Sequence, residues 1–522
     1  MAPAPVMSVL NSWAVFTPRE KRNITVYILG IMLYKFGLEA FNGSIIALAT
    51  NRYDYAGSTN TLERIGLLTG LNQAFQCVGS ILIAPLVRRY PTKVVLSSAI
   101  FLFGICTAIL LIVDAGTGGK MVPKGWHKKH GDNNFDYYGD YNTDAIIPIY
   151  SVAGIVYGMV ELIRRIVPRD IVGGNVQKLR RMDALVHIFY EVSGTAGAFC
   201  TALALIPRFG NNFSFIISPI FFGAASAVWF FLDIDFTQEY NGNLEGKPSY
   251  IRSVLSGAIL FFDSVWTGGK ILFSSRKFIW LLPGYSIALY AHRYLENGIA
   301  PQVAKRYLGH SAWAQIIVGG SNFGELLGAL FVFLYTNFVK TPVPWLRIDA
   351  LMLLIVWYIP YWRPPTGRVQ DAWMVAATFI PLSFGWAAGD VSLAAYIQAA
   401  LARMEGNTRN VSSLGAVMAF LYSVYIVTYA VTSPLLGKYL DGVYNSTGGN
   451  KGGGEIRTGL TMTAGVQFTI ISAMILTATM VPNGAWALNP ESLFNEDLDN
   501  EIAEKDEKAL DEEDEALPVV VN

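Results

Sequence analysis

Three ionisable residues recur at four-residue intervals within one apolar stretch of the chain: Asp183, His187 and Glu191. An α-helix turns once in about 3.6 residues, so the three side chains would share one stripe of a helix. An imidazole one turn away from a buried carboxyl can exchange a proton with it, because histidine titrates in the physiological range. We therefore expect His187 and Glu191 to bind and relay protons.

Other charged residues also lie inside apolar stretches. A charge in such a stretch costs several kcal/mol, so it is expected to face the protein interior or a water-filled path. Glu325 and Asp390 each follow a glycine, which permits the close approach of a ligand or of a neighbouring helix. The predicted substrate or proton pathway consists of Lys35, Glu39, His187, Glu191, Glu325 and Asp390.

Structural roles explain some of the same residues. Lys35 and Glu39 are four positions apart, so an internal ion pair explains them as well as contact with a substrate does. Glu191 is also explained as a carboxyl hydrogen-bonded between helices, although its histidine neighbour favours proton binding. Uncharged residues that could line a cavity, or hold helices together, are Gln73, Gln76, Tyr190, Tyr285 and Asn322.

The composition indicates which elements position these residues. Of the 522 residues, 52% are hydrophobic and 15% are charged, which is too little polar surface for a soluble globule. The apolar runs reach about 20 residues, the length of a helix that crosses the hydrocarbon core of a bilayer. We therefore predict an all-α polytopic membrane protein, with no cofactor, no resident metal site and no nucleic-acid partner.

Twelve apolar runs are long enough to cross a bilayer. The first six cover residues 24–49, 65–87, 94–113, 145–163, 183–206 and 213–232. The second six cover residues 279–298, 312–338, 346–362, 372–401, 411–437 and 459–481. The predicted domains are a cytoplasmic N-terminus (1–23), a six-helix half (24–232), a cytoplasmic connector (233–278), a second six-helix half (279–481) and an acidic disordered tail (482–522).

Basic residues predict the orientation, because short loops rich in lysine and arginine stay in the cytoplasm. The loop between the fourth and fifth runs contains Arg164, Arg165, Arg169, Lys178, Arg180 and Arg181. Three more basic residues precede the first run. We therefore predict that both termini are cytoplasmic and that the loop 114–144 lies outside or in a lumen, in the plasma membrane or in an organelle membrane such as that of the vacuole.

The loop 114–144 contains residue types that bind metals: His127, His130, Asp132, Asp136 and Asp140. Their spacing matches no defined ligand motif, so a solvated loop with balanced charge is the favoured interpretation. The connector contains a segment, residues 253–262, that could lie along the membrane surface.

The loop between the second and third runs, Ala84 to Lys93, carries part of a known signature, Gly-x-x-x-Asp-Arg-x-Gly-Arg-Lys. It matches at Leu86, Arg89 and Lys93, whereas Arg88 stands in the place of the acid and Pro91 in that of the glycine. The second half repeats a cation, proline, cation pattern from Lys340 to Arg347. With twelve runs divided six and six by a connector, the chain resembles the major facilitator superfamily of secondary transporters, and in particular its fungal-type members.

This resemblance implies a bundle in which the third, sixth, ninth and twelfth spans support the outside while the others line a central cavity. It implies that Arg88, Arg89 and Lys93 form a loop involved in conformational change. It also implies a monomeric secondary active transporter that moves a small solute by alternating access, coupled to protons. The open alternatives are a facilitated uniporter and a divalent metal-ion exporter similar to ferroportin, whose second half the segment from Trp386 to Asp390 resembles.

An enzyme is disfavoured, because the chain has no HExxH motif or comparable clustered set of a nucleophile or metal ligands near one membrane face. A sensor or scaffold with the same fold would carry a large soluble domain, whereas the tail of this chain is short and acidic.

Overall fold

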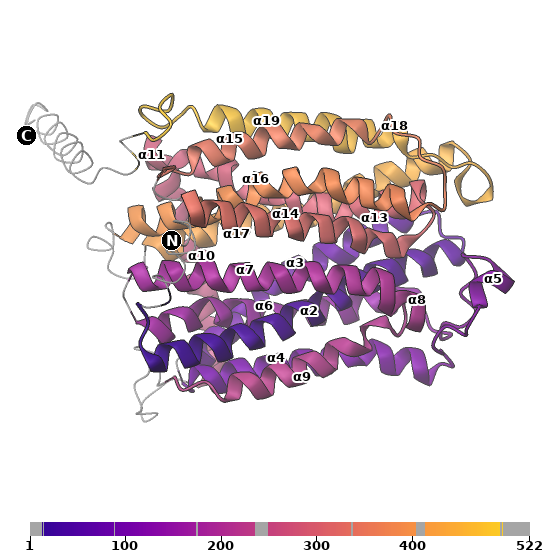
Figure 1. The fold of residues 1–522 in the computed structure, drawn as a ribbon, viewed down its shortest axis with the longest axis horizontal. Helices are drawn as coiled ribbons and strands as arrows, with labels where there is room; N and C mark the ends of the chain where they lie inside the picture. The colour runs from indigo at the N-terminus through magenta and orange to yellow at the C-terminus, as the bar shows by residue number, and fades with distance from the viewer. Residues whose placement is uncertain are drawn as a thin grey trace, which may run out of the picture.

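The computed structural model describes residues 13, 15–87, 89–173, 176–234, 249–335, 338–402, 413–490 and 493. Within these ranges the protein is an all-α bundle whose long helices run side by side (Figure 1). Nine of the described helices are long and apolar enough to cross a membrane. The predicted class, an all-α multi-pass membrane protein, is confirmed.

These nine spans are made by α2 (Pro18–Tyr55), α3 (Thr61–Val87), α4 (Thr92–Gly116), α6 (Ile146–Val172), α7 (Val176–Cys200) with α8 (Ile206–Phe209), α14 (Ala314–Tyr335), α16 (Val369–Ala402), α17 (Ser413–Ser446), and α18 (Arg457–Leu460) with α19 (Gln467–Ala478). Three further helical runs are shorter or interrupted. They are 214–230, which contains α9 (Ile217–Phe230); the irregular run 276–307; and 343–358, which contains α15 (Val343–Met352). These three runs lie where the sixth, seventh and ninth spans are predicted, and α10 (Tyr250–Ser274) and α5 (Trp126–His130) are further helices outside the predicted spans.

The run 276–307 alternates between α-helical and π-helical turns. Its α-helical parts are α11 (Arg276–Ile279), α12 (Ala288–Tyr294) and α13 (Ala300–Gln302), and its π-helical parts are Leu282–Ile287, Leu295–Ile299 and Val303–Tyr307. Pro283 and Pro301 remove backbone donors from this run, which favours departure from regular α-helix. Each π turn contains one extra residue and so changes which way the following side chains face.

Glycines bring helices into backbone contact within each half of the chain and also between the halves, where a Cβ on Gly437 of α17 would lie 2.3 Å from the carbonyl oxygen of Leu62 in α3. In the first half, a Cβ on Gly79 of α3 would lie 1.9 Å from the carbonyl oxygen of Ile155 in α6. Small residues allow such approach because membrane helices associate through close packing and not through the hydrophobic effect. In the second half, three α14 glycines meet carbonyl groups of α16 in the same way: Gly320, Gly324 and Gly328.

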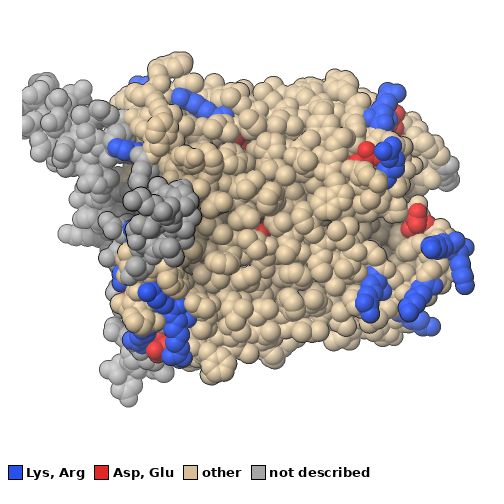
Figure 2. Space-filling view, in the orientation of Figure 1, with Lys and Arg blue, Asp and Glu red and all other residues tan. Residues whose placement is uncertain are grey.

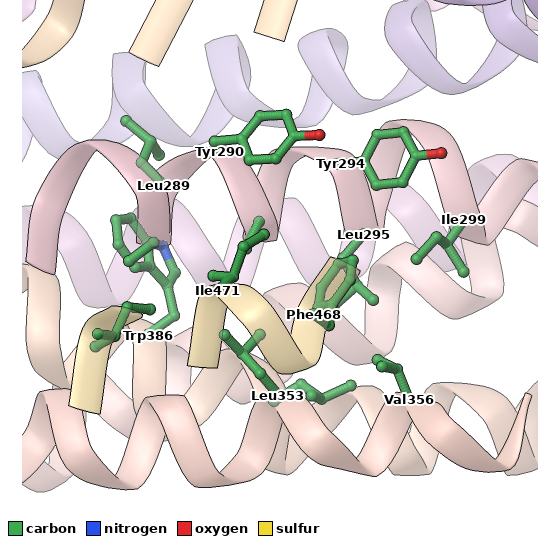
Figure 3. Close-up of a cluster of buried hydrophobic side chains, with 14 of the residues drawn as sticks. Leu289, Tyr290, Tyr294, Leu295, Ile299, Leu353, Val356, Trp386, Phe468 and Ile471 are labelled. Carbon is green, nitrogen blue, oxygen red and sulfur yellow. The ribbon is translucent and has the colours of Figure 1, made fainter. Parts of the chain in front are cut away.

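The buried apolar side chains form two large clusters. One cluster draws its residues from between Phe16 and Ile234, and the other draws nearly all of its residues from between Leu272 and Leu493. Figure 3 shows part of the second, where side chains of the run 276–307 meet those of the ninth, tenth and twelfth spans. Apolar contacts therefore lie mainly within each half of the chain, while the domain boundaries at 232 and 279 stay a prediction.

Charged side chains gather at the two ends of the bundle. Figure 2 shows lysine, arginine, aspartate and glutamate at both ends of one face, with a broad and almost uncharged band between them. This is the distribution expected of a surface that faces hydrocarbon, where an unpaired charge is costly.

Ion pairs show which segments share an end of the bundle. Lys178 contacts Glu20 at 2.8 Å, and Arg19 contacts Asp233 at 3.1 Å, so the starts of α2 and α7 lie beside the end of α9. The short helix α5 (Trp126–His130) lies at the opposite end (Figure 1). We refer to these as the basic end and the outer end.

The described part of the predicted tail is in contact with the rest of the protein. The Lys340 backbone N–H donates to Asn489 at 2.7 Å, and the Asn489 amide donates to the carbonyl of Phe338 at 2.9 Å. The remainder of the tail, apart from Leu493, lies outside the described residues, as does the part of the connector from 235 to 248.

The orientation predicts how the two ends react with a membrane-impermeant maleimide. Lys128 and Arg169 are both exposed, at the outer and the basic end respectively. In a background with Cys77, Cys106 and Cys200 replaced by alanine, Lys128→Cys should be labelled in sealed right-side-out vesicles. Arg169→Cys should be labelled only after permeabilisation, which also serves as its control for reactivity. Labelling in the opposite sense would reverse the predicted topology.

Candidate functional site

Lys35 and Glu39 of α2 form a buried ion pair near the middle of the bundle. The Lys35 Nζ lies 2.6 Å from a carboxylate oxygen of Glu39. A Cβ on Gly194 of α7 would lie 2.4 Å from the Lys35 Cε and 3.2 Å from the amide nitrogen of Asn322. Gly194 therefore makes room for the lysine at a point where α2, α7 and α14 meet, and Asn322 lies there as well.

The ring of Tyr190 has two cations near it. The Lys35 Nζ is 4.5 Å and the Arg164 Cζ is 4.7 Å from its centroid, within the range of cation–π attraction. Arg164 in turn pairs with Glu161 at 2.6 Å, and the Tyr34 hydroxyl donates to Glu161 at 2.8 Å. Tyr190, predicted as a cavity residue, thus belongs to the same polar cluster as the α2 pair.

The position of Arg164 differs from the sequence prediction. We assigned it to a loop that begins after residue 163, but α6 continues to Val172. Its guanidinium therefore lies within the helical bundle and pairs with Glu161 one turn away. Arg164 was predicted to lie in a loop because it begins the run of basic residues that predicts the orientation, and a run of arginines is typical of a loop.

A third ion pair comes from the run 276–307. Arg293 contacts Glu296 at 2.9 Å, and the Ser321 hydroxyl of α14 donates to the other oxygen of Glu296 at 2.8 Å. The sequence analysis missed both charged residues. Their spacing of three within a predicted span is the signal that would have found them.

Glu191 of α7 and Glu325 of α14 pair with each other. Their carboxyl groups lie close enough to interact, and the two residues are 1% and 9% exposed. Neither has a basic partner at salt-bridge distance among the described residues, although Lys35 and Arg293 act on Glu191 through space. Two adjacent carboxylates repel strongly in a buried site, so a proton shared by the pair would stabilise it.

Glu191 and Glu325 differ from the other carboxyls of this buried polar cluster, because neither has a cation of its own. Three of its carboxylates each have a cation, in the pairs Lys35–Glu39, Arg164–Glu161 and Arg293–Glu296. Glu191 and Glu325 are the two remaining carboxyls of the group, and they belong to opposite halves of the chain. The second oxygen of Glu191 is buried and has no hydrogen-bond partner.

His187 and Asp390 also lie near each other. His187 precedes Glu191 by one turn of α7, toward the basic end, and Asp390 of α16 acts on it electrostatically. The Nε2 of His187 is buried without a hydrogen-bond partner. The six predicted pathway residues therefore lie along the junction of the two halves, although no contact here tests their roles in transport.

The remaining predicted cavity residues have structural contacts. The Gln76 amide donates to Gln73 at 3.0 Å within α3. Tyr285 packs against Tyr422 with ring centroids 6.0 Å apart. These contacts fit the interpretation that such residues hold helices together.

A second buried pair, His292 and Asp349, was missed as well. The His292 Nε2 lies 2.8 Å from the Asp349 carboxylate, and the imidazole stacks on Trp386 with centroids 5.1 Å apart. All three residues belong to the second half of the chain. The pair therefore joins the run 276–307 to the ninth span within that half.

The predicted conformational loop joins helix ends at the basic end. The Lys93 Nζ donates to the carbonyl of Leu232, just after α9, at 3.2 Å. Arg347, its counterpart at the repeat position, donates to the carbonyl of Thr479, just after α19, at 3.2 Å. Carbonyls at helix ends lack intrahelical partners and carry partial negative charge, so both cations are placed where they stabilise a helix end.

Arg89 of the same loop donates to the Ser253 hydroxyl at 2.6 Å. Arg88 lies outside the described residues.

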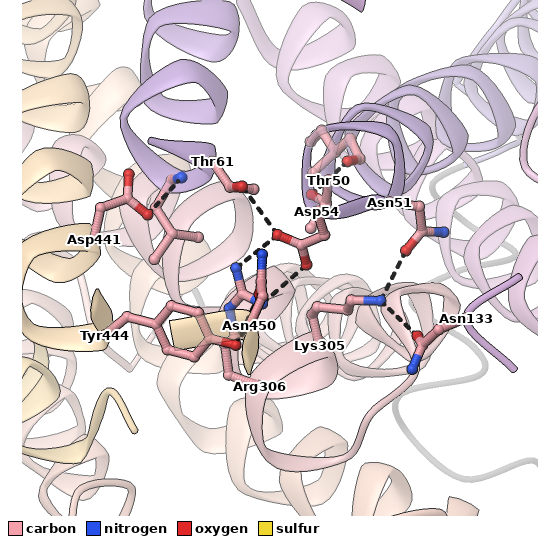
Figure 4. A network of polar contacts seen from close by, with 12 residues as sticks. Thr50, Asn51, Asp54, Thr61, Asn133, Lys305, Arg306, Asp441, Tyr444 and Asn450 are labelled. Atoms are coloured by element: carbon pink, nitrogen blue, oxygen red, sulfur yellow. Dashed lines mark hydrogen bonds and ion pairs between the residues drawn. The ribbon is translucent and has the colours of Figure 1, made fainter. Parts of the chain in front are cut away.

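At the outer end, a polar network joins the two halves (Figure 4). The Arg306 guanidinium donates to both carboxylate oxygens of Asp54 at 2.9 Å, and the Thr61 hydroxyl donates to Asp54 at 2.9 Å. The Asp54 and Arg306 side chains are 11% and 7% exposed. A bidentate pair with so little exposure is among the stronger ionic contacts of proteins.

The loop 114–144 takes part in this network. The Lys305 Nζ donates to Asn51 at 3.1 Å and to Asn133 at 3.0 Å, so the loop reaches the second half (Figure 4). Asp441 accepts hydrogen bonds from the backbone N–H groups of Leu62 and Glu63. A carboxylate of α17 therefore offsets the partial positive charge at the N-terminus of α3. The cavity behind these contacts measures about 20 Å³, room for about one water. These contacts hold the two halves together at the outer end.

The metal-type residues of the loop 114–144 have other contacts. The His130 ring stacks on Trp126 at 4.0 Å, and Asp132 lies 3.8 Å from His310. Among the residues that the structure describes, no group of three or more histidines, cysteines or acids is arranged to hold a metal ion.

No protein-family profile and no curated protein sequence matches the chain. Solved structures do match, each at 11% identity. A mutant of the nucleoside transporter NupG gives a TM-score of 0.57 over 87% of this chain and 99% of that one. A D-xylose-proton symporter gives 0.56 over 90% and 98%, and the peptide transporter POT in complex with sulfate gives 0.58 over 90% and 96%. The chain therefore shares the fold of these transporters.

The buried pair of α2 predicts an asymmetry between single and double variants. Lys35→Met leaves the Glu39 carboxylate buried without its partner and should lower the melting temperature strongly, since breaking a buried pair costs about 3–5 kcal/mol. Adding Glu39→Gln removes the orphaned charge and should restore most of the loss. The measurement is thermal unfolding of the purified protein in detergent. A double variant as unstable as Lys35→Met would show that the pair does not act as a unit.

Proposed function

We propose that the protein is a proton-coupled secondary active transporter that moves a small solute by alternating access. The observation that carries the proposal is the proximity of the buried carboxyl groups of Glu191 and Glu325, one from each half of the chain. The fold supports it, because the same arrangement of helices serves a nucleoside transporter, a D-xylose-proton symporter and a peptide transporter.

Protonation of this carboxyl pair would control the distance between the halves. With a proton bound, the pair forms a hydrogen bond between α7 and α14 and favours the arrangement seen here. When the proton leaves, two carboxylates face each other in a site of low dielectric and repel. A ligand shifts a conformational equilibrium only by binding one state more tightly than the other, and the proton satisfies this condition here.

His187 and Asp390 offer a path for that proton. His187 lies one turn closer to the basic end than Glu191 does and interacts with Asp390, and an imidazole can pass a proton between a buried carboxyl and water. The cations of the cluster are held by their own carboxylates, in the pairs of Lys35 with Glu39 and of Arg293 with Glu296. They therefore stabilise the cluster without neutralising the pair of Glu191 and Glu325.

The cluster also restricts the substrate class. Its carboxyls outnumber its cations, which disfavours a simple anion. The Asn322 amide nitrogen and the second oxygen of Glu191 are buried and unpaired, so they offer one donor and one acceptor close to Lys35. We propose a small polar or zwitterionic solute that binds to these groups at the junction of the halves.

The contacts at the outer end and the predicted topology complete the proposal. Both termini are assigned to the cytoplasm, the unit is a monomer, and the two six-helix halves move relative to each other. Solute and proton then enter or leave at the basic end in the state seen here. The network around Asp54 and Arg306 would have to open in the other state.

The carboxyl pair predicts the effect of Glu191→Gln. The amide of glutamine can still donate to Glu325, so the variant should fold and reach the membrane in normal amounts. It cannot release a proton, so solute accumulation driven by a pH gradient should fall to background while solute exchange persists. The measurement is uptake into vesicles at several external pH values. Asp140→Asn, which removes an exposed carboxyl of the outer loop, is the matched control and should behave as wild type.

An unchanged pH profile in Glu191→Gln protein of normal abundance would contradict proton coupling through this pair. Transport as a uniporter, or with another ion, would then be the remaining explanation. Loss of the protein from the membrane would instead support the structural role of Glu191.

The outer network predicts that Asp54→Asn opens the outer end. The change removes one charge of the pair with Arg306, so the outward-open state should gain population. A cysteine at Thr50, which lines the small cavity behind the network, should then react at least about tenfold faster with an impermeant thiol reagent, as expected for a shift of about 1.4 kcal/mol. The rate of labelling from the outer side is the measurement.

Arg368→Gln is the control for this comparison. It removes an ion pair with Asp371 that lies within the second half of the chain, so it should leave the labelling rate unchanged. Equal rates for Asp54→Asn and wild type would show that the pair does not hold the outer end closed.

A further inference from the structure

The helix α10 (Tyr250–Ser274) joins the two halves and is not one of the membrane spans. Near its start, the Tyr250 hydroxyl donates to the carbonyl of Leu82, close to the end of α3, at 3.0 Å. Near its end, a Cβ on Gly268 would lie 2.0 Å from the carbonyl oxygen of Ala416, close to the start of α17. Both contacts are toward the basic end of the bundle, which fits a helix that runs across that end.

One exposed stripe of α10 is apolar. At about 100° per residue, its members fall within ~80° of the helix circumference. Each is more than half exposed, from 56% for Phe273 to 71% for Ile251 and Ile259. The stripe consists of Ile251, Leu255, Ile259, Phe262, Trp266 and Phe273.

The exposed arc next to this stripe is polar. Arg252, Asp263 and Lys270 fall within the next ~60°, together with two serines. On the other side of the apolar stripe the helix packs on the protein, where Gly268 and Leu272 are buried. A helix with an apolar and a polar stripe side by side on its exposed arc fits an orientation in the plane of the membrane interface. The apolar stripe then faces the acyl chains and the polar stripe faces the headgroups.

A hollow opens beside the C-terminal part of α10. Its volume is about 410 Å³, and its walls include Phe262, Trp266 and Phe273 of α10 and Phe420 of α17. Lys270 lies at its edge, with the Nζ 5.3 Å from the ring centroid of Trp266. The site thus joins an apolar hollow, large enough for part of an acyl chain, to a single exposed cation.

We propose that this hollow binds one anionic phospholipid of the surrounding bilayer, with an acyl chain between the aromatic side chains and the phosphate on Lys270. The bilayer is the source of the ligand, because the hollow borders helices that span the membrane and lies beside the apolar stripe. The charge is complementary, because cations next to the cytoplasmic leaflet attract its anionic lipids. The proposal does not depend on the proposed transport function.

A lipid bound to α10 would affect the rest of the protein, because α10 contacts both halves. The helix touches α3 of the first half and α17 of the second, and Ser253 accepts a hydrogen bond from Arg89 of the loop that follows α3. A lipid bound to α10 therefore stabilises the connector in a position where it contacts both halves.

The test measures lipid binding to the purified full-length protein by native mass spectrometry, with phosphatidylglycerol and phosphatidylcholine as probes. We expect phosphatidylglycerol to bind at least about fivefold more tightly, since one basic residue near a lipid surface contributes about 1 kcal/mol. Lys270→Gln should reduce its affinity to that of phosphatidylcholine. Lys128→Gln, which removes an exposed lysine at the outer end, is the control and should retain the preference.

Each result decides the proposal. Equal binding of the two lipids to wild type, or an unchanged preference in Lys270→Gln, overturns it. Lys270 is exposed, so the variant should fold, and its melting temperature in lipid-free detergent confirms this independently of lipid.

A second measurement tests the orientation on which the site depends. Spin labels at Leu255 and Phe262 should report the same depth in a bilayer if α10 lies in the interface. A spanning helix would separate them by about 10 Å in depth, at 1.5 Å of rise per residue, and would exclude the site.

Discussion

The bundle has to keep charges inside a membrane, and it does so by pairing them. Three cations and three carboxylates at the junction of the halves form short ion pairs at 2.6, 2.6 and 2.9 Å. These contacts remove the cost of each buried charge. They leave one carboxyl pair, Glu191 and Glu325, whose charge depends on a proton. The helices, their glycine contacts and the polar network at the outer end all serve to hold this pair across the junction.

Close helix packing at glycines occurs both within the halves and between them. Backbone contact at glycines joins α3 to α6 and α14 to α16, and it also joins α3 to α17 across the junction, where a Cβ on Gly66 would lie 2.5 Å from the carbonyl oxygen of Ser433. Lys93 and Arg347 hold the last helix of each half by its terminal carbonyls. Polar contacts such as that of Asp54 with Arg306 cross the junction as well. Movement of the halves therefore has to change the packing of α3 on α17 together with the charge-dependent contacts.

The membrane spans could be predicted from the sequence, because the length and hydropathy of each apolar run determine them locally. It also predicted the pair of Lys35 and Glu39, because a spacing of four brings two side chains together on any helix. It could not predict that Glu191 meets Glu325. These residues are 134 positions apart (325 minus 191), and only the packing of α7 on α14 brings them together. Arg293 and Glu296 were missed within a correctly predicted span, and Arg164 was missed because its helix continues two turns beyond the apolar run.

The π turns of the run 276–307 set the angle between the interior cluster and the outer network. Glu296 of the cluster and Arg306 of the network belong to this one element, with the π-helical segments Leu295–Ile299 and Val303–Tyr307 around and between them. Removing one residue between them would rotate Arg306 by about 100° relative to Glu296 and shorten their separation by about 1.5 Å. The structure therefore constrains the number of residues between Glu296 and Arg306 more strictly than it constrains which amino acids those residues are. A chain of this fold can exchange many side chains along this stretch, but a single deletion would uncouple its inner and outer contacts.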